Sequence, residues 1–301
     1  MNTTDTAIRA GARPASKVPQ APDTPPITSK GSANNGSIYG MLAPDTVGER
    51  AIRDLVSPEE WQMRVDLAAA YRLMDHYGMT EMIYNHITAR VPGAPEQFLI
   101  NAYGLHYSEI TASNLHKIDE SGEFVLRGNS HYGVNYPGFI IHGAVHAARP
   151  DIVCVIHSHS TEGIAVSSMK EGLMPLCLLG MRFAGNIGYH DCEGTVVNID
   201  ERASLARDLG PHNAMLLRHH GVIACGPTVA EAFNTHYMIE RACKVQVAAL
   251  SAGTAGLLMP AQEAVDATAK AFRPESRRAY GVMEWEALLR LLDRRDPSYK
   301  T

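Results

Sequence analysis

The stretch Val153-Cys154-Val155-Ile156-His157-Ser158-His159 joins an apolar strand to a pair of histidines. A β-strand alternates its side chains between two faces, so His157 and His159 are expected to point the same way, about 7 Å apart along the chain. Two imidazoles at this spacing can bind one divalent ion, and a third would leave one coordination position open. The tripeptide also occurs by coincidence in proteins without a metal, so the rest of the chain must decide.

Strand-like and helix-like segments alternate around this stretch, which is typical of a layered α/β fold. The apolar run at 152–157 predicts a strand covered on both faces. Ser57-Pro58-Glu59-Glu60 and Thr228-Val229-Ala230-Glu231 are capping boxes, and Asp200 is a third candidate cap. Further strands are predicted at 98–100, 195–199, 214–218 and 222–225, and helices at 57–77, 138–148, 160–168, 228–252 and 285–292.

The composition changes along the chain and suggests three parts. Residues 1–47 are rich in Pro, Ser, Thr, Asn and Gly, and such a segment cannot bury enough apolar surface to fold alone. We therefore expect a flexible N-terminal arm at 1–47, a single α/β domain at 48–255 and a helical tail at 256–301.

The 301 residues are 45% hydrophobic and 20% charged, as in ordinary globular proteins, and the formal net charge is −5. The chain has no basic run, so we expect no nucleic-acid partner. It has no secretory segment and no apolar run of membrane-spanning length. The five cysteines are widely spaced and form no Cys-x-x-Cys, which disfavours a cysteine zinc site. These features predict a cytoplasmic, reduced protein without a membrane partner.

Two further histidine pairs accompany the first. His142 and His146 lie four apart and share a helix face, where they could contribute to a site or be buried and hydrogen-bonded. His219 and His220 point to opposite sides of an extended chain, so at most one is expected in a site. Gly221 is expected to allow a sharp turn there.

Several motifs together resemble the class II aldolase/adducin family over residues 60–255. The motifs are Arg149-Pro150-Asp151, the 155–160 segment, the 217–226 segment and Tyr189-His190-Asp191. The resemblance implies an α/β/α layered sheet in a homotetramer with active sites between subunits. It also implies Zn²⁺, or Mn²⁺ or Fe²⁺, on His157, His159 and His220, and substrate binding by Asn85.

The chain departs from the sugar-phosphate aldolases of that family. The glutamate that acts there as acid and base falls on Gly138, and the Ser-Gly pair that holds phosphate reads Tyr103-Gly104. A phosphate would lose hydrogen bonds worth about 1.5–3 kcal/mol each. The segment 136–142 is closer to the adducin-like branch, which includes non-catalytic adducin heads and enzymes resembling decarboxylases of hydroxyaryl acids.

These departures predict a metal-dependent lyase, a decarboxylase of a non-phosphorylated hydroxyaryl or keto acid. His190, Tyr189 and His142 are the candidate proton donors. Arg182 is a candidate clamp for the substrate carboxylate, or else a surface or interface residue. The alternatives are an aldolase, dehydratase or epimerase acting on a hydroxy-keto compound, and an adducin-like scaffold without chemistry.

Overall fold

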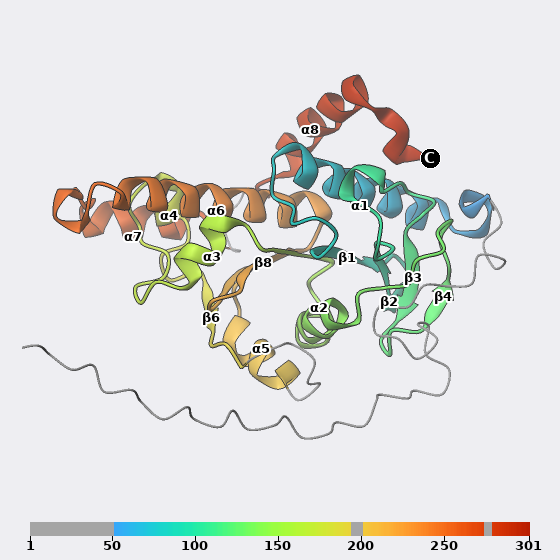
Figure 1. The fold of residues 1–301 in the computed structure, drawn as a ribbon, viewed down its shortest axis with the longest axis horizontal. Coiled ribbons are helices and arrows are strands. Elements are labelled where there is room, and N and C mark those ends of the chain that lie inside the picture. The colour runs from blue at the N-terminus through green and yellow to red at the C-terminus, as the bar shows by residue number, and fades with distance from the viewer. Residues whose placement is uncertain (1–50, 194–200, 274–278) are drawn as a thin grey trace, which may run out of the picture.

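A mixed eight-stranded sheet organises the computed structural model, which describes residues 51–193, 201–273 and 279–301 (Figure 1). The strand order is β4-β3-β2-β1-β5-β8-β7-β6, and neighbours are antiparallel except for the parallel pair β6 and β7. The strands are β1 (His86–Val91), β2 (Ala94–Ile100), β3 (His116–Asp119), β4 (Phe124–Leu126), β5 (Cys154–Ser158), β6 (Gly188–His190), β7 (Ala214–Leu217) and β8 (Gly221–Gly226).

Helices cover the sheet on both faces, which confirms the predicted α/β/α layering. Figure 1 shows α1 and α6 along one side of the sheet and α2 and α5 along the other. The helices are α1 (Pro58–His76), α2 (Tyr136–Ala148), α3 (Thr161–Ser167), α4 (Leu178–Met181), α5 (Glu201–Leu209), α6 (Val229–Leu250), α7 (Gln262–Ala271) and α8 (Val282–Arg295).

The central strand β5 explains why the sequence there is continuously apolar. Cys154 and Ile156 pack in the core formed with α1 and α6, whereas Val155 packs in the core formed with α2 and α5. Both faces are buried, as predicted for 152–157. His157 lies on the α2 side of β5, directly opposite His86 of β1.

Helix starts follow the predicted caps. The Ser57 hydroxyl accepts a hydrogen bond from the Glu60 backbone N–H (3.1 Å), and Thr228 does the same for Glu231 (3.1 Å). The predicted arm at 1–47, the predicted strand at 195–199 and the cap at Asp200 lie outside the described residues. No helix of the described ranges is long and apolar enough to cross a membrane.

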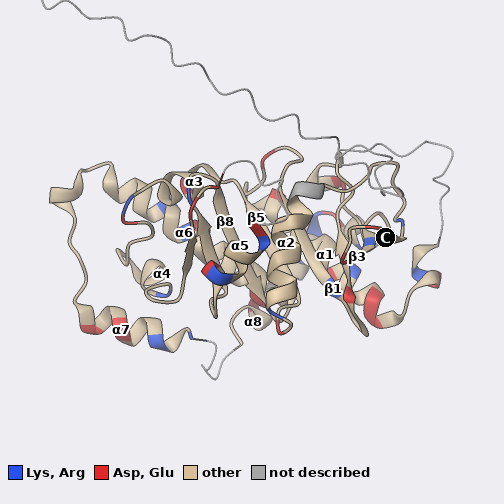
Figure 2. Ribbon diagram, turned by 90° about the horizontal axis from the view of Figure 1, so that it is seen from below, with Lys and Arg blue, Asp and Glu red and all other residues tan. Residues whose placement is uncertain are grey.

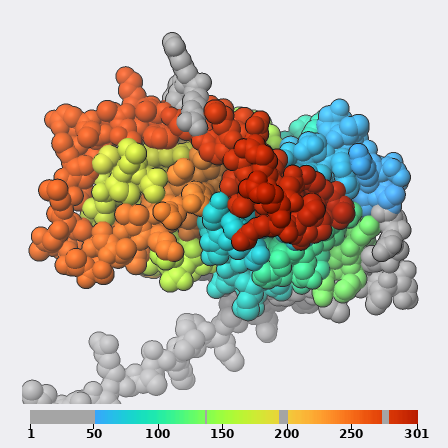
Figure 3. Space-filling model, turned by 90° about the horizontal axis from the view of Figure 1, so that it is seen from above, coloured from blue at the N-terminus to red at the C-terminus, as the bar shows by residue number. Residues whose placement is uncertain are grey.

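The C-terminal segment returns to the N-terminal part of the chain. Figure 3 shows it, in red, lying across α1 and the neighbouring residues, and Trp285 and Leu292 join the core that α1 builds. The Trp285 indole N–H donates to Asp66 of α1 (3.0 Å). Acidic and basic residues are interspersed along the ribbon (Figure 2).

Candidate metal centre

Three imidazoles meet where β5, β7 and β8 come together. The Nε2 atoms of His157 and His159 are 2.8 Å apart, and those of His159 and His220 are 2.9 Å apart. Nitrogens around a tetrahedral Zn²⁺ lie about 3.3 Å apart, because each Zn–N bond is ~2.0–2.1 Å. Within the described ranges this is the one group of three or more potential ligands close enough to share an ion. The predicted ligand set is therefore brought together.

The strand ends supply these side chains. His157 lies in β5, His159 directly follows it, and His220 occupies the turn between β7 and β8. The sharp turn is made by His219, whose φ of +61° is in the left-handed region, and not by Gly221 as the sequence suggested. Gly221 is needed for another reason: a Cβ there would lie 2.2 Å from the Ser158 carbonyl oxygen, so only glycine lets β8 approach β5 so closely.

Hydrogen bonds on the outer nitrogens orient two of the rings. His157 Nδ1 lies 3.0 Å from the Val222 carbonyl, to which it donates, so its Nε2 is unprotonated in the neutral ring. His159 Nδ1 lies 2.8 Å from a carboxylate oxygen of Glu81. Such partners fix the tautomer and raise the basicity of a ligating imidazole.

Burial lowers the pKa of two of the three ligands, His157 and His220. Burial and the neighbouring histidines lower the pKa of His157 well below its ordinary value. The same causes, burial first and then His159, lower the pKa of His220 to about 4. Both rings therefore present lone pairs at neutral pH, which is the state that binds a divalent metal. The residues present fit the implied ion.

Glu240 of α6 holds the peptide on either side of His159. The hydroxyls of Ser158 and Ser160 donate short hydrogen bonds to its two carboxylate oxygens. The Glu240 side chain is 6% exposed, and burial raises its pKa. One buried carboxylate thus fixes the backbone that presents the middle ligand.

Glu81 and Asn85 form a second support for His159. The Asn85 side-chain oxygen accepts a hydrogen bond from the Glu81 backbone N–H (3.0 Å). The Asn85 side-chain nitrogen is buried and has no partner within the part of the chain that the structure describes. Asn85 is predicted to bind substrate. It contacts Glu81, which in turn contacts the ligand His159, and its own amide nitrogen is still available to donate.

The ring of His86 fills the space where a side chain at position 138 would lie. A Cβ on Gly138 would be 2.4 Å from His86 Cε1, and the His86 ring centroid is 5.5 Å from that of His157. Within the described part of the chain neither ring nitrogen of His86 has a hydrogen bond of regular geometry, and burial lowers the pKa of this ring to about 3. An imidazole therefore occupies the space that a side chain at position 138 would need.

His142 lies one ring further from the cluster, with its centroid 4.1 Å from that of His86. Its Nδ1 is 2.8 Å from the Thr88 hydroxyl, which also lies 2.8 Å from His146 Nε2. His142 is fully buried, and burial lowers its pKa well below the ordinary value. The structure places this candidate proton donor behind His86 and not beside the ligands.

His190 is the predicted donor that lies beside the ligands. It lines a small cavity of about 10 Å³ together with His220. Its two ring nitrogens lie 2.8 Å from Asp208 and 3.3 Å from Glu201, so both face carboxylates.

Tyr189 points to the other face of β6, because successive residues of a strand alternate. It pairs with Leu216 of β7, which packs in the core under α3 and α6, and its hydroxyl accepts from the Leu173 N–H (3.1 Å). The structure does not bring Tyr189 to the histidines.

Tyr103 and Gly104 follow β2 at the end of the sheet where His86 begins β1. The register pairs Thr88 with Ile100, so the chain leaves β2 beside the start of β1. Gly104 has a φ of +132°, and a Cβ there would lie 2.4 Å from the Tyr132 ring. The Tyr132 ring thus packs against the loop that carries Tyr103 and Gly104.

Arg182 does not join the cluster. It lines a cavity together with Ala214, where β7 begins, and Pro227, just beyond the end of β8. His220 lies at the opposite ends of both strands. We expected Arg182 to bind a substrate carboxylate beside the metal. Within one chain this is wrong, because Arg182 follows α4 at the far end of the sheet.

Comparisons with known proteins agree with this geometry. The profile of the class II aldolase and adducin N-terminal domain matches residues 65–247. An aldolase II superfamily protein from Pseudomonas syringae is 43% identical, with a TM-score of 0.80 over 84% of this chain and 100% of its own. An L-fuculose 1-phosphate aldolase from Glaciozyma antarctica is 26% identical, with a TM-score of 0.71 over 81% of this chain and 93% of its own. Mouse alpha-adducin is 37% identical over 89% of this chain, which spans 38% of the adducin.

Proposed function

Since the chain belongs to the class II aldolase and adducin family, we propose that it is a divalent-metal-dependent carbon–carbon lyase that decarboxylates a non-phosphorylated hydroxyaryl or keto acid. The observation that carries the proposal is the convergence of three imidazoles within reach of one ion, near a position, Gly138, that has no carboxylate. His157, His159 and His220 would hold the ion, with Zn²⁺ the first candidate and Mn²⁺ or Fe²⁺ the others.

A cation bound there would supply Lewis acidity toward an oxygen of the substrate. The reaction breaks the bond between carbon and the carboxylate, releases CO₂ and leaves the electron pair on carbon, which must then take up a proton. No carboxylate base of the enzyme is needed to remove a proton first. A site whose acid/base position is a glycine packed against His86 fits this requirement.

The protein must return a proton to the carbanion. His190 is the candidate that lies beside a ligand, and Asp208 and Glu201 hold both of its nitrogens. These two hydrogen-bonding contacts fix the orientation of the His190 ring. Asn85 offers a buried amide donor for a substrate oxygen.

Two other functions, one catalytic and one not, are compatible with the relatives. The L-fuculose 1-phosphate aldolase suggests aldol cleavage, but Tyr103-Gly104 and Gly138 remove the phosphate-binding and acid/base groups used there. The adducin relative suggests a scaffold, but three imidazoles that meet within reach of one ion, two of them with a lowered pKa, favour a bound ion. A homotetramer with sites between subunits is part of the proposal.

Metal analysis separates the enzyme from the scaffold. We expect about one divalent ion per chain in the purified protein. We also expect His157→Ala to lose that ion, because the two remaining imidazoles make a much weaker site. His131→Ala, which removes an exposed histidine, is the matched control and should retain it. A wild-type protein that binds no divalent ion would contradict the proposal.

Product analysis then divides decarboxylase from aldolase. Hydroxyphthalate-type acids and β-keto acids are assayed for CO₂, and hydroxy-keto acids are assayed for released aldehyde. We expect metal-dependent CO₂ release that falls at least a hundredfold in His157→Ala. Aldehyde release without CO₂ would assign the aldolase activity instead, and CO₂ release that survives the substitution would exclude the site.

A further inference from the structure

Arg182 is a buried cation held between aromatic rings. Its side chain belongs to a residue that is 9% exposed, and its guanidinium carbon lies 4.8 Å from the Phe272 ring centroid and 5.5 Å from that of Tyr280. One nitrogen, Nη1, donates to the Asn234 side-chain oxygen of α6 (2.9 Å). The rings and this hydrogen bond fix the plane of the guanidinium.

This cation has no anionic partner within ion-pair distance among the described residues. Arg64, the other buried arginine of the described residues, contrasts with it, because its guanidinium lies 3.0 Å from the Glu60 carboxylate. A buried charge without a partner costs several kcal/mol, so such groups normally face a counter-ion. Burial also lowers the pKa of Arg182 to about 10, although the nearby Tyr280 and Glu284 offset part of the lost hydration.

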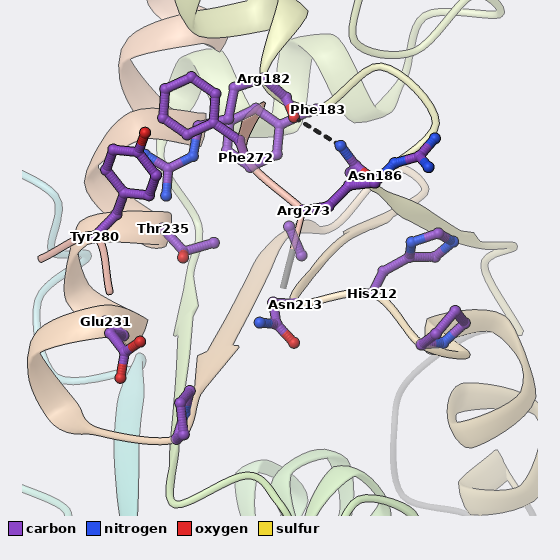
Figure 4. Close-up of a pocket in the computed structure, with 13 residues that line it drawn as sticks. Arg182, Phe183, Asn186, His212, Asn213, Glu231, Thr235, Phe272, Arg273 and Tyr280 are labelled. Carbon is purple, nitrogen blue, oxygen red and sulfur yellow. Dashed lines mark hydrogen bonds between the residues drawn. The ribbon is translucent and has the colours of Figure 1, made fainter. Parts of the chain in front are cut away.

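A cavity of about 110 Å³ lies beside this guanidinium (Figure 4). Its wall carries further groups that bind anions: the side chains of Arg273, Asn213, His212 and Thr235. In Figure 4 the Arg182, Phe272 and Tyr280 side chains stack along one side, and Asn213 and His212 lie across from them. Among the described residues that line the cavity, the one carboxylate is that of Glu231, which accepts a hydrogen bond from the Thr228 hydroxyl (2.9 Å).

The cavity is remote from the metal centre. Its wall includes Ala214 at the start of β7 and Pro227 just after β8, whereas His220 lies between the opposite ends of these strands. The six residues of β8 rise ~3.3 Å each, so the two sites are about 15 Å or more apart. A small substrate bound to the histidines cannot reach Arg182 of the same chain.

We propose that this cavity is a second ligand site, which binds a small oxyanion-bearing molecule, a carboxylate or a phosphate, against the Arg182 guanidinium. The planar fork of arginine matches the two oxygens of such a group, and Arg273 adds a second positive charge. Asn213 and Thr235 supply neutral polar groups for the rest of a small molecule.

The test measures anion binding to the full-length, metal-loaded protein by isothermal calorimetry and by thermal shift. Inorganic phosphate and acetate are the two probes, and they separate a phosphate from a carboxylate ligand. We expect saturable binding of at least one probe. Arg182→Met should abolish that binding. Arg182→Lys should weaken it at least tenfold, because lysine keeps the positive charge but lacks the two parallel N–H donors of the guanidinium. Arg290→Met, on the exposed face of α8, is the control and should leave binding unchanged.

Further variants keep the test decisive. Thr235→Val retains the shape of the helix residue and should weaken binding even if Arg182→Met fails to fold. His157→Ala should leave anion binding unchanged, so failure of the proposed lyase and failure of this site are distinguishable. The proposal is overturned if wild-type protein binds neither probe, or if binding survives Arg182→Met. It is also overturned if Arg182→Met only dissociates an oligomer, since a carboxylate of a second copy would then be the partner.

Discussion

Glu240 shows how a residue outside the ligand set can control a ligand. Its two oxygens accept from Ser158 and Ser160, and these serines flank His159 on either side. The carboxylate is buried. If either serine turned away to bond with water, a carboxylate oxygen would lose its hydrogen-bond donor inside the protein. We infer that Glu240 is a positioning residue, which acts on the ion through the backbone at His159.

Glu240→Ala is expected to weaken metal affinity by about 10–100-fold, the usual effect of losing an outer partner. Glu240→Gln should lose less, because one acceptor oxygen remains. Competition with a chromophoric chelator measures the affinity. The spectrum of a Co²⁺-substituted protein tests whether ligand geometry has changed, which a loss of stability alone would not alter.

The exposed Glu286 of α8 provides the control. Glu286→Gln removes a carboxylate of the same type far from Ser158 and should leave both affinity and spectrum unchanged. Equal affinities of wild type and Glu240→Ala would show that the serines alone fix the loop.

The sequence predicts the three ligands but not their supports. The ligands are distinctive because two of them lie two residues apart and the third precedes a glycine. Glu81 lies 78 residues before His159, and Glu240 lies 80 residues after Ser160. Nothing in either local sequence marks a partner, because these contacts arise only when α6 and the 79–85 segment pack against the end of β5.

At the scale of elements, α2 carries two glycines with opposite roles. A Cβ at Gly138 would lie 2.4 Å from the buried His86 ring, whereas at Gly143 the nearest atom is the end of the Arg202 side chain, 3.3 Å away. The first contact cannot relax without moving a ring that also touches His142 and His157. The second can relax by a small movement of a flexible side chain.

Gly138→Ala is therefore expected to lower the free energy of unfolding by about 1–3 kcal/mol through overpacking. Gly143→Ala, on the same helix, should leave it unchanged or raise it by up to ~1 kcal/mol, since alanine favours a helix. Urea unfolding followed by circular dichroism measures both. The double variant His86→Ala/Gly138→Ala should show a favourable coupling, because removing the ring makes room for the methyl group.

Additivity in that cycle would mean that His86 does not fill the space at Gly138. The contact itself could not be read from the sequence. The sequence shows a glycine at 138, but β1 and α2 must first pack before His86 meets it.

Most helices and the strands around the histidines were predictable, but other strands were not. No strand was predicted at β1, and only 98–100 of the seven-residue β2 was expected. Helices α1, α2, α6 and α8 and strands β5, β7 and β8 follow from caps, apolar periodicity and apolar runs. β3 and β4 have four and three residues with polar side chains among them, too few to show a period. These strands are selected by pairing with β2 at the edge of the sheet and not by their own composition.

At the scale of the whole molecule, buried neutral histidines make stability depend on pH. Six are buried with lowered pKa values, and burial is the largest cause in each: His86, His116, His142, His146, His157 and His236. In the unfolded chain a histidine titrates near 6.5. Between that value and the lower folded value, the unfolded state binds more protons, so stability falls as the pH falls.

We expect the free energy of unfolding, measured in urea with a chelator present, to be nearly constant from pH 8 to 7. It should then fall between pH 6.5 and about 4, by about 1.4 kcal/mol per pH unit for each proton taken up. His236→Leu should make the slope shallower by up to one proton, because both ring nitrogens of His236 are buried without a hydrogen bond. A stability that is independent of pH from 7 to 5 would contradict the assignment of neutral buried rings.

The separation of the ligands along the chain has a consequence for folding. His157 and His159 are neighbours in the unfolded chain, but His220 lies 61 residues after His159. It reaches them only when β8 has paired with β5, after a long loop has closed. A partly folded chain can therefore offer an ion only two of these three imidazoles, and the third arrives with the central sheet. In a refolding experiment the ion would therefore stabilise the chain only at a late step. Complete coordination would mark the moment at which β8 has paired with β5.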